Sequence, residues 1–212
     1  MSQEDITWIQ WFCSLPENRF LCEVDESFIE TDFNLYGLDT TVKHFDLVLE
    51  NILQLEFSQE ISEELMIQIE EESKKIYGLI HARYIVTLAG QQKMLKKFEN
   101  VEFGCCSCVK CNKYPLLPLG ISDLYGIENM KLYCACCNDI YVVPKQCPSR
   151  NLDGSFFGTT FPHLLLLQLD EHPQNEFNYI PRIFGFKIAN NSYERPTEYQ
   201  TFVGRSTFCH YN

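Results

Sequence analysis

The sequence is short of positive charge and of long apolar runs. Its 212 residues include 17 Lys and Arg against 29 Asp and Glu, a formal net charge of −12. Because phosphate contacts need clustered Lys and Arg, this balance argues against a nucleic-acid binder. The longest aliphatic run covers only residues 164–167, whereas crossing a bilayer takes ~20 apolar residues. The first residues include Glu4 and Asp5, where a secretory signal is basic and then apolar. We therefore expect neither nucleic acid nor a membrane among the partners.

The signatures of a catalytic centre are also missing. The sequence contains no Gly-rich phosphate loop, no His-Arg-Asp catalytic motif and no Asp-Phe-Gly motif, so it is not that of a usual protein kinase. Its histidines lack a companion nucleophile or ligand set, which favours structural roles for all of them: His44, His81, His163, His172 and His210. We predict that the chain is not an enzyme.

Cysteine, by contrast, is abundant and unevenly placed. The total of 11 is odd, and with no signal peptide this indicates a reducing compartment without disulfides. Seven of the cysteines fall between Cys105 and Cys137, in two groups separated by some twenty residues. Two thiolates from each of two tight turns form a structural zinc ribbon. Merely buried thiols would not bunch in this way, and a redox dithiol would need a βαβ setting that this region lacks.

The spacing identifies one ligand pair and leaves the other open. The second group supplies Cys134 and Cys137 most simply. The first group offers three pairs with an allowed spacing, namely Cys105 with Cys108, Cys106 with Cys111, and Cys108 with Cys111. Four thiolates and one Zn²⁺ have a net charge of −2, which three nearby basic residues are placed to offset: Lys110, Lys113 and Lys131.

The hydrophobic pattern predicts an α+β protein, with an all-helical N-terminal domain followed by a four-cysteine zinc-ribbon domain of short antiparallel strands. We expect the helical domain to cover residues 1–101, the ribbon domain 102–189, and a loosely ordered polar tail 190–212. The predicted helices cover residues 7–13, 26–33, 42–55, a long segment that Ser62 caps and Gly90 breaks, and 91–98. The predicted strands cover 131–133 and 139–143, while 164–169 fits a buried strand or a short helix.

Several separated blocks of sequence resemble the regulatory (beta) subunit of casein kinase II. The similarity spans roughly residues 6 to 189 and is carried by residues 8–13, 22–26, 77–84, 117–123, 131–134, 157–163 and 181–188. It implies a non-catalytic regulator of a cytoplasmic and nuclear Ser/Thr kinase, which binds and stabilises the catalytic alpha subunits and modulates their activity and substrate choice. The alternative is a zinc-ribbon module that binds nucleic acid or the transcription machinery.

The resemblance also selects the zinc ligands. Alignment without a gap places the family's first pair on Cys106 and Cys111 and its second pair on Cys134 and Cys137, so that each chain holds one structural Zn²⁺. Cys105, Cys108 and Cys136 are then additional thiols. In the family the ribbon forms a homodimer that carries two catalytic subunits. We expect pairing to use exposed apolar residues beside the ribbon: Leu116, Leu117, Leu119, Tyr133 and Tyr141.

The resemblance implies three further sites. Leu164, Phe184, Phe186 and Ile188 would contact the catalytic subunit. The alternation in residues 182–188 fits an interior strand, but also a hairpin that projects from the surface. Ser2, with Asp5 three residues on, resembles the family's self-phosphorylation site. Glu56, Glu60, Glu63 and Glu64 form a shortened version of its acidic segment, which would bind basic substrates or polyamines, although such a charge run also suits a plain solvated surface.

Overall fold

The computed structural model describes residues 6–169 and 182–187. The α-helices are α1 (Trp8–Ser14), α2 (Glu26–Ile29), α3 (Asp32–Leu35), α4 (Phe45–Ile52), α5 (Glu63–Tyr84), α6 (Leu88–Glu99) and α7 (Phe161–Leu166). The short 3₁₀ turns are η1 (Pro16–Asn18), η2 (Asp39–Thr41), η3 (Val109–Cys111), η4 (Pro148–Asn151) and η5 (Gly154–Phe156). The strands are β1 (Leu117–Leu119), β2 (Lys131–Cys134), β3 (Asp139–Val142), β4 (Arg182–Ile183) and β5 (Phe186–Lys187).

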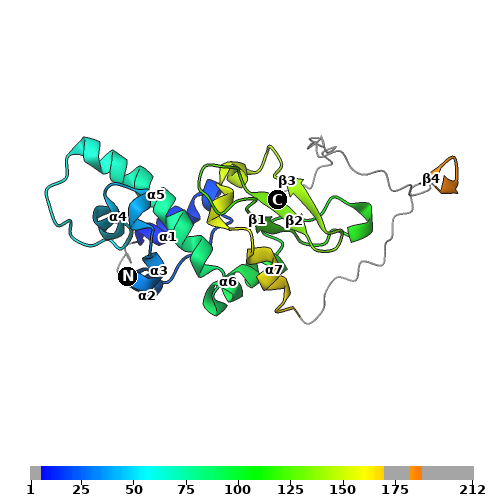
Figure 1. Cartoon of the computed structure of the whole chain (residues 1–212), viewed down its shortest axis with the longest axis horizontal. Coiled ribbons are helices and arrows are strands. Elements are labelled where there is room, and N and C mark those ends of the chain that lie inside the picture. The colour runs from blue at the N-terminus through cyan, green and yellow to red at the C-terminus, as the bar shows by residue number, and fades with distance from the viewer. Residues whose placement is uncertain (1–5, 170–181, 188–212) are drawn as a thin grey trace, which may run out of the picture.

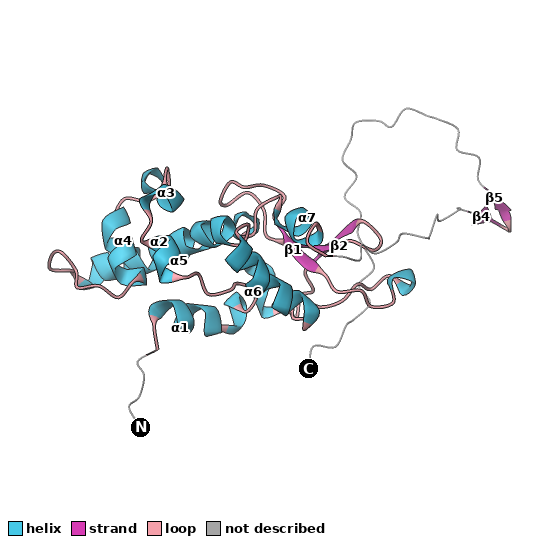
Figure 2. Ribbon diagram, turned by 90° about the horizontal axis from the view of Figure 1, so that it is seen from below, coloured by secondary structure: helices cyan, strands magenta, loops and turns pink. Residues whose placement is uncertain are grey.

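Helices α1 to α4 gather at one end of the body and the β1–β3 sheet lies at the other, where α7 packs against β1 (Figure 1). The long helix α5 runs from the helical end toward the sheet (Figure 2) and contacts η5 there. The α+β class predicted from the sequence is therefore confirmed. None of the helices in the described residues is long and apolar enough to span a bilayer. The domain boundary at residue 102 stays a prediction, and the tail 190–212 lies outside the described residues.

An aromatic cluster fixes α1 against α5. The ring of Trp8 stacks on Phe12 with centroids 4.8 Å apart, and both rings pack edge-on against Tyr77 of α5. The Tyr77 hydroxyl donates to the Cys22 carbonyl at 3.0 Å and accepts from the Val24 amide at 3.1 Å. Because these polar groups are buried, each would cost free energy if left unpaired. The N-terminal segment is therefore held to α5 by both apolar and polar contacts.

The predicted helices are present, with two corrections. The segment 26–33 is divided into α2 and α3, because Thr31 adopts an extended backbone between them. The long helix ends at Tyr84, and Gly90 lies inside α6 instead of breaking it. Thr87 starts α6 by accepting the Gly90 amide on its hydroxyl at 3.2 Å. A Cβ on Gly90 would lie 2.2 Å from the Tyr84 carbonyl oxygen, so the glycine permits the close approach of two helices.

The β1–β3 sheet carries one strand that the sequence pattern missed. β2 pairs antiparallel with β1 on one side and β3 on the other, with Leu117 opposite Tyr133 and Cys134 opposite Asp139. β1 contains Pro118, which lacks an amide hydrogen and is tolerated here because β1 is an edge strand of this sheet. Residues 161–166 form a helix, which settles the alternatives of strand and helix for that segment.

His81 joins α5 to the Cys-rich half of the chain. Its Nε2 accepts the Cys22 amide at 3.1 Å, which leaves Nδ1 protonated to donate to the Phe156 carbonyl of η5 at 2.7 Å. One turn earlier, Gly78 allows the Phe156 ring to lie directly on the helix backbone. The predicted structural role of this histidine agrees with its complete burial.

His81 makes stability depend on pH. Burial lowers the pKa of His81 from its ordinary value of 6.5 to about 4. As the pH falls from 6.5 toward 4, His81 becomes protonated in the unfolded chain but stays neutral in the folded chain. The free energy of unfolding should therefore decrease by up to about 1.4 kcal/mol per pH unit from this residue alone. Urea unfolding between pH 7.5 and 5 would measure the slope.

A variant isolates this contribution from that of the carboxylates. His81→Gln should be less stable than the wild type at pH 7.5. On acidification its free energy of unfolding should fall less steeply than that of the wild type, because up to one fewer proton is taken up on unfolding. An unchanged slope in His81→Gln would contradict the assignment of this pH dependence to the buried imidazole.

Candidate metal centre

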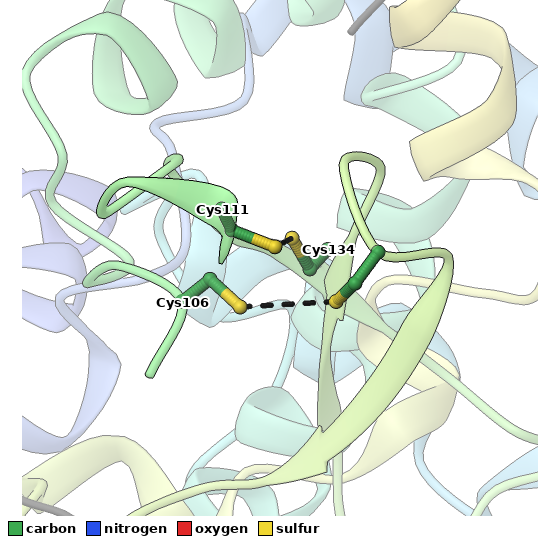
Figure 3. Close-up of side chains that lie close together, drawn as sticks. Cys106, Cys111 and Cys134 are labelled. Carbon is green, nitrogen blue, oxygen red and sulfur yellow. Dashed lines mark hydrogen bonds between the residues drawn. The ribbon is translucent and has the colours of Figure 1, made fainter. Parts of the chain in front are cut away.

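Four cysteine sulfurs converge between the first Cys-rich turn and the β2–β3 hairpin. The Sγ atoms of Cys106, Cys111, Cys134 and Cys137 all lie within 4.8 Å of one another. The Cys106–Cys137 sulfurs are 3.8 Å apart and the Cys111–Cys134 sulfurs 3.9 Å apart, so each contact joins the first turn to the second (Figure 3). Among the described residues, this is the set that the structure gathers as a possible metal site.

The first turn is held by backbone hydrogen bonds around its two cysteines. The Cys106 amide donates to the Tyr114 carbonyl at 2.8 Å, and the Tyr114 amide returns to the Cys111 carbonyl at 2.9 Å. The Cys108 amide donates to the Cys106 sulfur at 3.4 Å. Asn112 reverses the chain with a left-handed backbone, φ 46°. This closed turn directs both sulfurs to the same side.

The second turn connects β2 to β3. Cys134 ends β2 and is fully buried, while Cys137 precedes β3 and is half-buried. Asn138 closes the turn in the left-handed region, φ 56°, and its side chain accepts a hydrogen bond from the Tyr133 hydroxyl at 2.8 Å. Asparagine tolerates this conformation better than most residues. The hairpin therefore presents the second pair of sulfurs at a defined separation.

The electrostatics of the four thiols favour a cation. Burial is the main cause that raises the pKa of Cys134 to about 12, and it also raises the pKa of Cys111 far above its usual range. For Cys106 burial acts in the same direction, but hydrogen bonds from Tyr141 and the Cys108 amide outweigh it and leave the pKa lowered. Buried sulfurs this close together cannot all be thiolates without a nearby cation, because their negative charges repel one another. A divalent cation would stabilise the thiolates together.

The donor set and its spacing fit zinc. A tetrahedral ion with Zn–S bonds of about 2.3 Å separates its sulfurs by about 3.8 Å, close to the 3.8 and 3.9 Å of the two measured pairs. Four thiolates close the coordination shell and favour a structural role over a catalytic one. The geometry selects Cys106 with Cys111 from the three pairs that spacing left open. That the four residues hold a metal stays a prediction.

The predicted exposure of the apolar residues beside the ribbon needs correction. Of the apolar residues expected to be exposed for pairing, most are at least nine-tenths buried within the chain: Leu116, Leu117, Leu119 and Tyr133. Helix α7 contacts β1, and His163 at its start packs edge-on against Tyr133, so this side of the sheet is covered. Lys131 forms an ion pair with Glu128 at 2.5 Å, and its expected role in offsetting the thiolate charge stays a prediction.

Apolar exposure near the centre lies elsewhere. Val109 of η3 is 95% exposed, and Ile140 and Val142 of β3 are 48% and 74% exposed. β3 is also an edge strand of its sheet. Tyr141 between them is half-buried, and its hydroxyl lies 3.1 Å from the Cys137 sulfur and 3.4 Å from the Cys106 sulfur. Sequence reasoning misses this contact, because the apolar pattern assigns the residue to the exposed surface.

The predicted kinase-contact residues occupy two elements. β4 and β5 form a hairpin in which Ile183 pairs with Phe186, and Phe184 and Gly185 form a two-residue loop with φ values of 50° and 86°. Of the two alternatives that the sequence left open for this segment, the structure therefore shows the hairpin. The Phe184 and Phe186 side chains are 97% and 80% exposed. Leu164 lies on α7 and is 37% exposed.

The other predicted site residues can be placed only in part. Glu56 and Glu60 lie in the loop between α4 and α5, and Glu63 and Glu64 occupy the first turn of α5, all exposed. Negative charges in the first turn interact favourably with the positive end of the helix dipole. This stabilisation of α5 is a sufficient structural reason for acidic residues at positions 63 and 64. Ser2 and Ile188 lie outside the described residues.

Comparison with known proteins agrees with this architecture. Residues 7–187 match the family model described as the casein kinase II regulatory subunit. The chain is 44% identical over 193 residues to casein kinase II subunit beta of Schizosaccharomyces pombe, which covers 90% of this chain and 83% of the relative. It is 41% identical to subunit beta' of Drosophila melanogaster, covering 94% and 92% of the two chains. The matched region contains the four converging cysteines and the hairpin residues Phe184 and Phe186, and the chain therefore belongs to the casein kinase II regulatory subunit family.

Proposed function

We propose that this regulatory subunit holds one structural Zn²⁺ on Cys106, Cys111, Cys134 and Cys137, and dimerises beside that centre. The convergence of four sulfurs from two separate turns is the observation that carries the proposal. A small sheet of three short strands has little core of its own, so closing the centre would supply much of the stability of this part. The ion would hold the two turns together and thereby orient η3 and β3.

The surface beside the centre suits a second copy of the chain. Val109, Ile140 and Val142 expose apolar side chains on η3 and on the edge strand β3. Exposed apolar side chains on an unpaired strand edge favour association. A twofold contact here would bury these residues in both copies and place two ribbons back to back.

The β4–β5 hairpin would bind the catalytic subunit of the kinase. Its two phenylalanines are exposed aromatic anchors, and each would contribute ~1.5–3 kcal/mol on burial in a partner's pocket. Leu164 and Ile188 would extend this contact. A regulator that binds only the active conformation of the catalytic subunit would stabilise that conformation and raise its population.

Native mass measurement of the purified complex tests the assembly. The expected species contains two copies of this chain, two catalytic subunits and two Zn²⁺ ions. A monomer without metal would contradict both the metal centre and the dimer, whereas a metal-loaded monomer would contradict the pairing surface alone. A salt-dependent mobility shift with DNA or RNA would support the rival nucleic-acid module, against which the net charge of −12 argues.

A further inference from the structure

The Tyr141 hydroxyl lies between the two cysteine turns. It is 3.1 Å from the Cys137 sulfur of the second turn and 3.4 Å from the Cys106 sulfur of the first. Tyr141 belongs to β3, where it faces Leu132 across the hairpin. One side-chain oxygen thus contacts one sulfur from each of the two turns that the proposed ion would join.

The direction of these hydrogen bonds depends on whether the sulfurs carry protons. When Cys106 is a thiol, its S–H donates to the Tyr141 oxygen, whereas between Tyr141 and Cys137 either the hydroxyl or the thiol can be the donor. Cysteine binds a metal as the thiolate, which has no proton to donate. In the loaded centre, the hydroxyl is the group that carries the shared proton, and both neighbouring sulfurs act as acceptors.

We propose that Tyr141 is a positioning residue of the metal centre, whose hydroxyl donates to the metal-bound thiolate of Cys137 and is shared with that of Cys106. This inference rests on the proposed metal centre. Four thiolates around a divalent ion have an excess of two negative charges, and a hydrogen-bond donor spreads part of that charge. The Cys108 amide supplies a second donor to Cys106 from the backbone. Removing a group that hydrogen-bonds to a metal ligand in this way commonly lowers the metal affinity about tenfold to a hundredfold.

Tyr141→Phe tests the role of the hydroxyl, because it removes one oxygen and keeps the ring. The full chain loaded with Zn²⁺ would be mixed with an excess of a coloured chelator, and the rate of zinc transfer recorded. We expect Tyr141→Phe to release zinc about ten to a hundred times faster than the wild type. A rate within twofold of the wild type would overturn the proposal.

Tyr133→Phe is a matched control from the neighbouring strand. Its hydroxyl donates to the Asn138 side chain at 2.8 Å and so supports the same hairpin without contacting a sulfur. We expect this variant to release zinc close to the wild-type rate. If Tyr133→Phe releases zinc as fast as Tyr141→Phe, the effect comes from loosening of the hairpin and the proposed donor role is wrong.

Cobalt(II) provides a second readout that does not depend on release. A hydrogen bond stabilises the sulfur lone pairs, so its loss should move the sulfur-to-cobalt charge-transfer band of Tyr141→Phe to lower energy. The Tyr133→Phe band should stay at the wild-type position. An unshifted Tyr141→Phe band would overturn the inference while leaving the metal centre intact. A wild-type chain that binds neither ion would instead refute the metal centre itself, and the inference with it.

Discussion

Replacing Phe184 and Phe186 together by alanine should abolish capture of the catalytic kinase subunit. Both side chains are almost fully exposed on the β4–β5 hairpin, so the free subunit loses few contacts when they are removed. If each ring contributes ~1.5–3 kcal/mol in the complex, the double variant binds at least about a hundredfold more weakly. Titration calorimetry with the purified catalytic subunit would measure the affinity.

The backbone of the hairpin supports this assignment. Phe184 has φ 50° in the loop that joins the two strands. A two-residue loop with two positive φ values matches the twist of a hairpin, but this conformation costs a residue with a Cβ of the order of 1–2 kcal/mol. Asparagine or glycine would fit the position more easily. An aromatic side chain kept there at such a cost is consistent with a binding role at the tip of the hairpin.

The chain also offers a matched control for this experiment. Phe33 and Tyr36, on and just after α3, are 87% and 84% exposed. Their double replacement by alanine removes a similar amount of exposed aromatic surface and should leave capture of the kinase unchanged. Metal content and dimerisation should stay at wild-type values in both double variants. Undiminished capture by the Phe184, Phe186 variant would contradict the docking assignment.

The sequence predicts most of the helical half because local signals agree there. The predicted cap Ser62 accepts the Leu65 amide on its hydroxyl, and the apolar stripe of α5 recurs at helical spacing through Ile69, Ile76 and Ile80. The role predicted for Gly90 is wrong, because a glycine that breaks a helix and one that permits close packing look the same in sequence. Only the approach of α6 to the Tyr84 carbonyl distinguishes the two.

The metal centre is predictable in composition but not in every ligand. Three pairings of the first cysteine group satisfy the spacing rule, since spacing restricts which sulfurs can meet without saying which do. The hydrogen bonds that fold residues 106–114 into a closed turn decide the matter. The Tyr141 contact arises from the β2–β3 register and from an approach across 35 residues to Cys106. Periodicity along the chain does not report such a contact.

The second large effect is expected from Cys134→Ser. Cys134 is completely buried at the end of β2, and its sulfur lies 3.9 Å from that of Cys111. A serine hydroxyl is a poor zinc ligand, and apparent binding free energies of structural zinc sites are about 10–16 kcal/mol. We expect the variant to lose its metal and its dimer together. Elemental analysis and native mass measurement would follow both quantities in the same sample.

The neighbouring Cys136 is a possible replacement ligand, and it also offers a control position for the same substitution. It lies two residues on in the same turn, half-buried, and could replace the missing sulfur. Cys136→Ser alone should keep the metal and the dimer, because this residue is not in the converging set. Cys134→Ser combined with Cys136→Ser removes the replacement and should give complete loss.

Amide hydrogen exchange would show which parts of the chain lose protection when the metal is lost. Protection should fall mainly over β1–β3 and residues 105–116, since these turns depend on the centre for their closure. The aromatic cluster of Trp8, Phe12 and Tyr77 should keep α1 and the middle of α5 protected, because its contacts lie within the helical part. The end of α5 near His81 is one point of connection, through its hydrogen bond to Phe156. Retention of a stable dimer after complete loss of metal would refute the proposal that the cysteine centre organises the pairing surface.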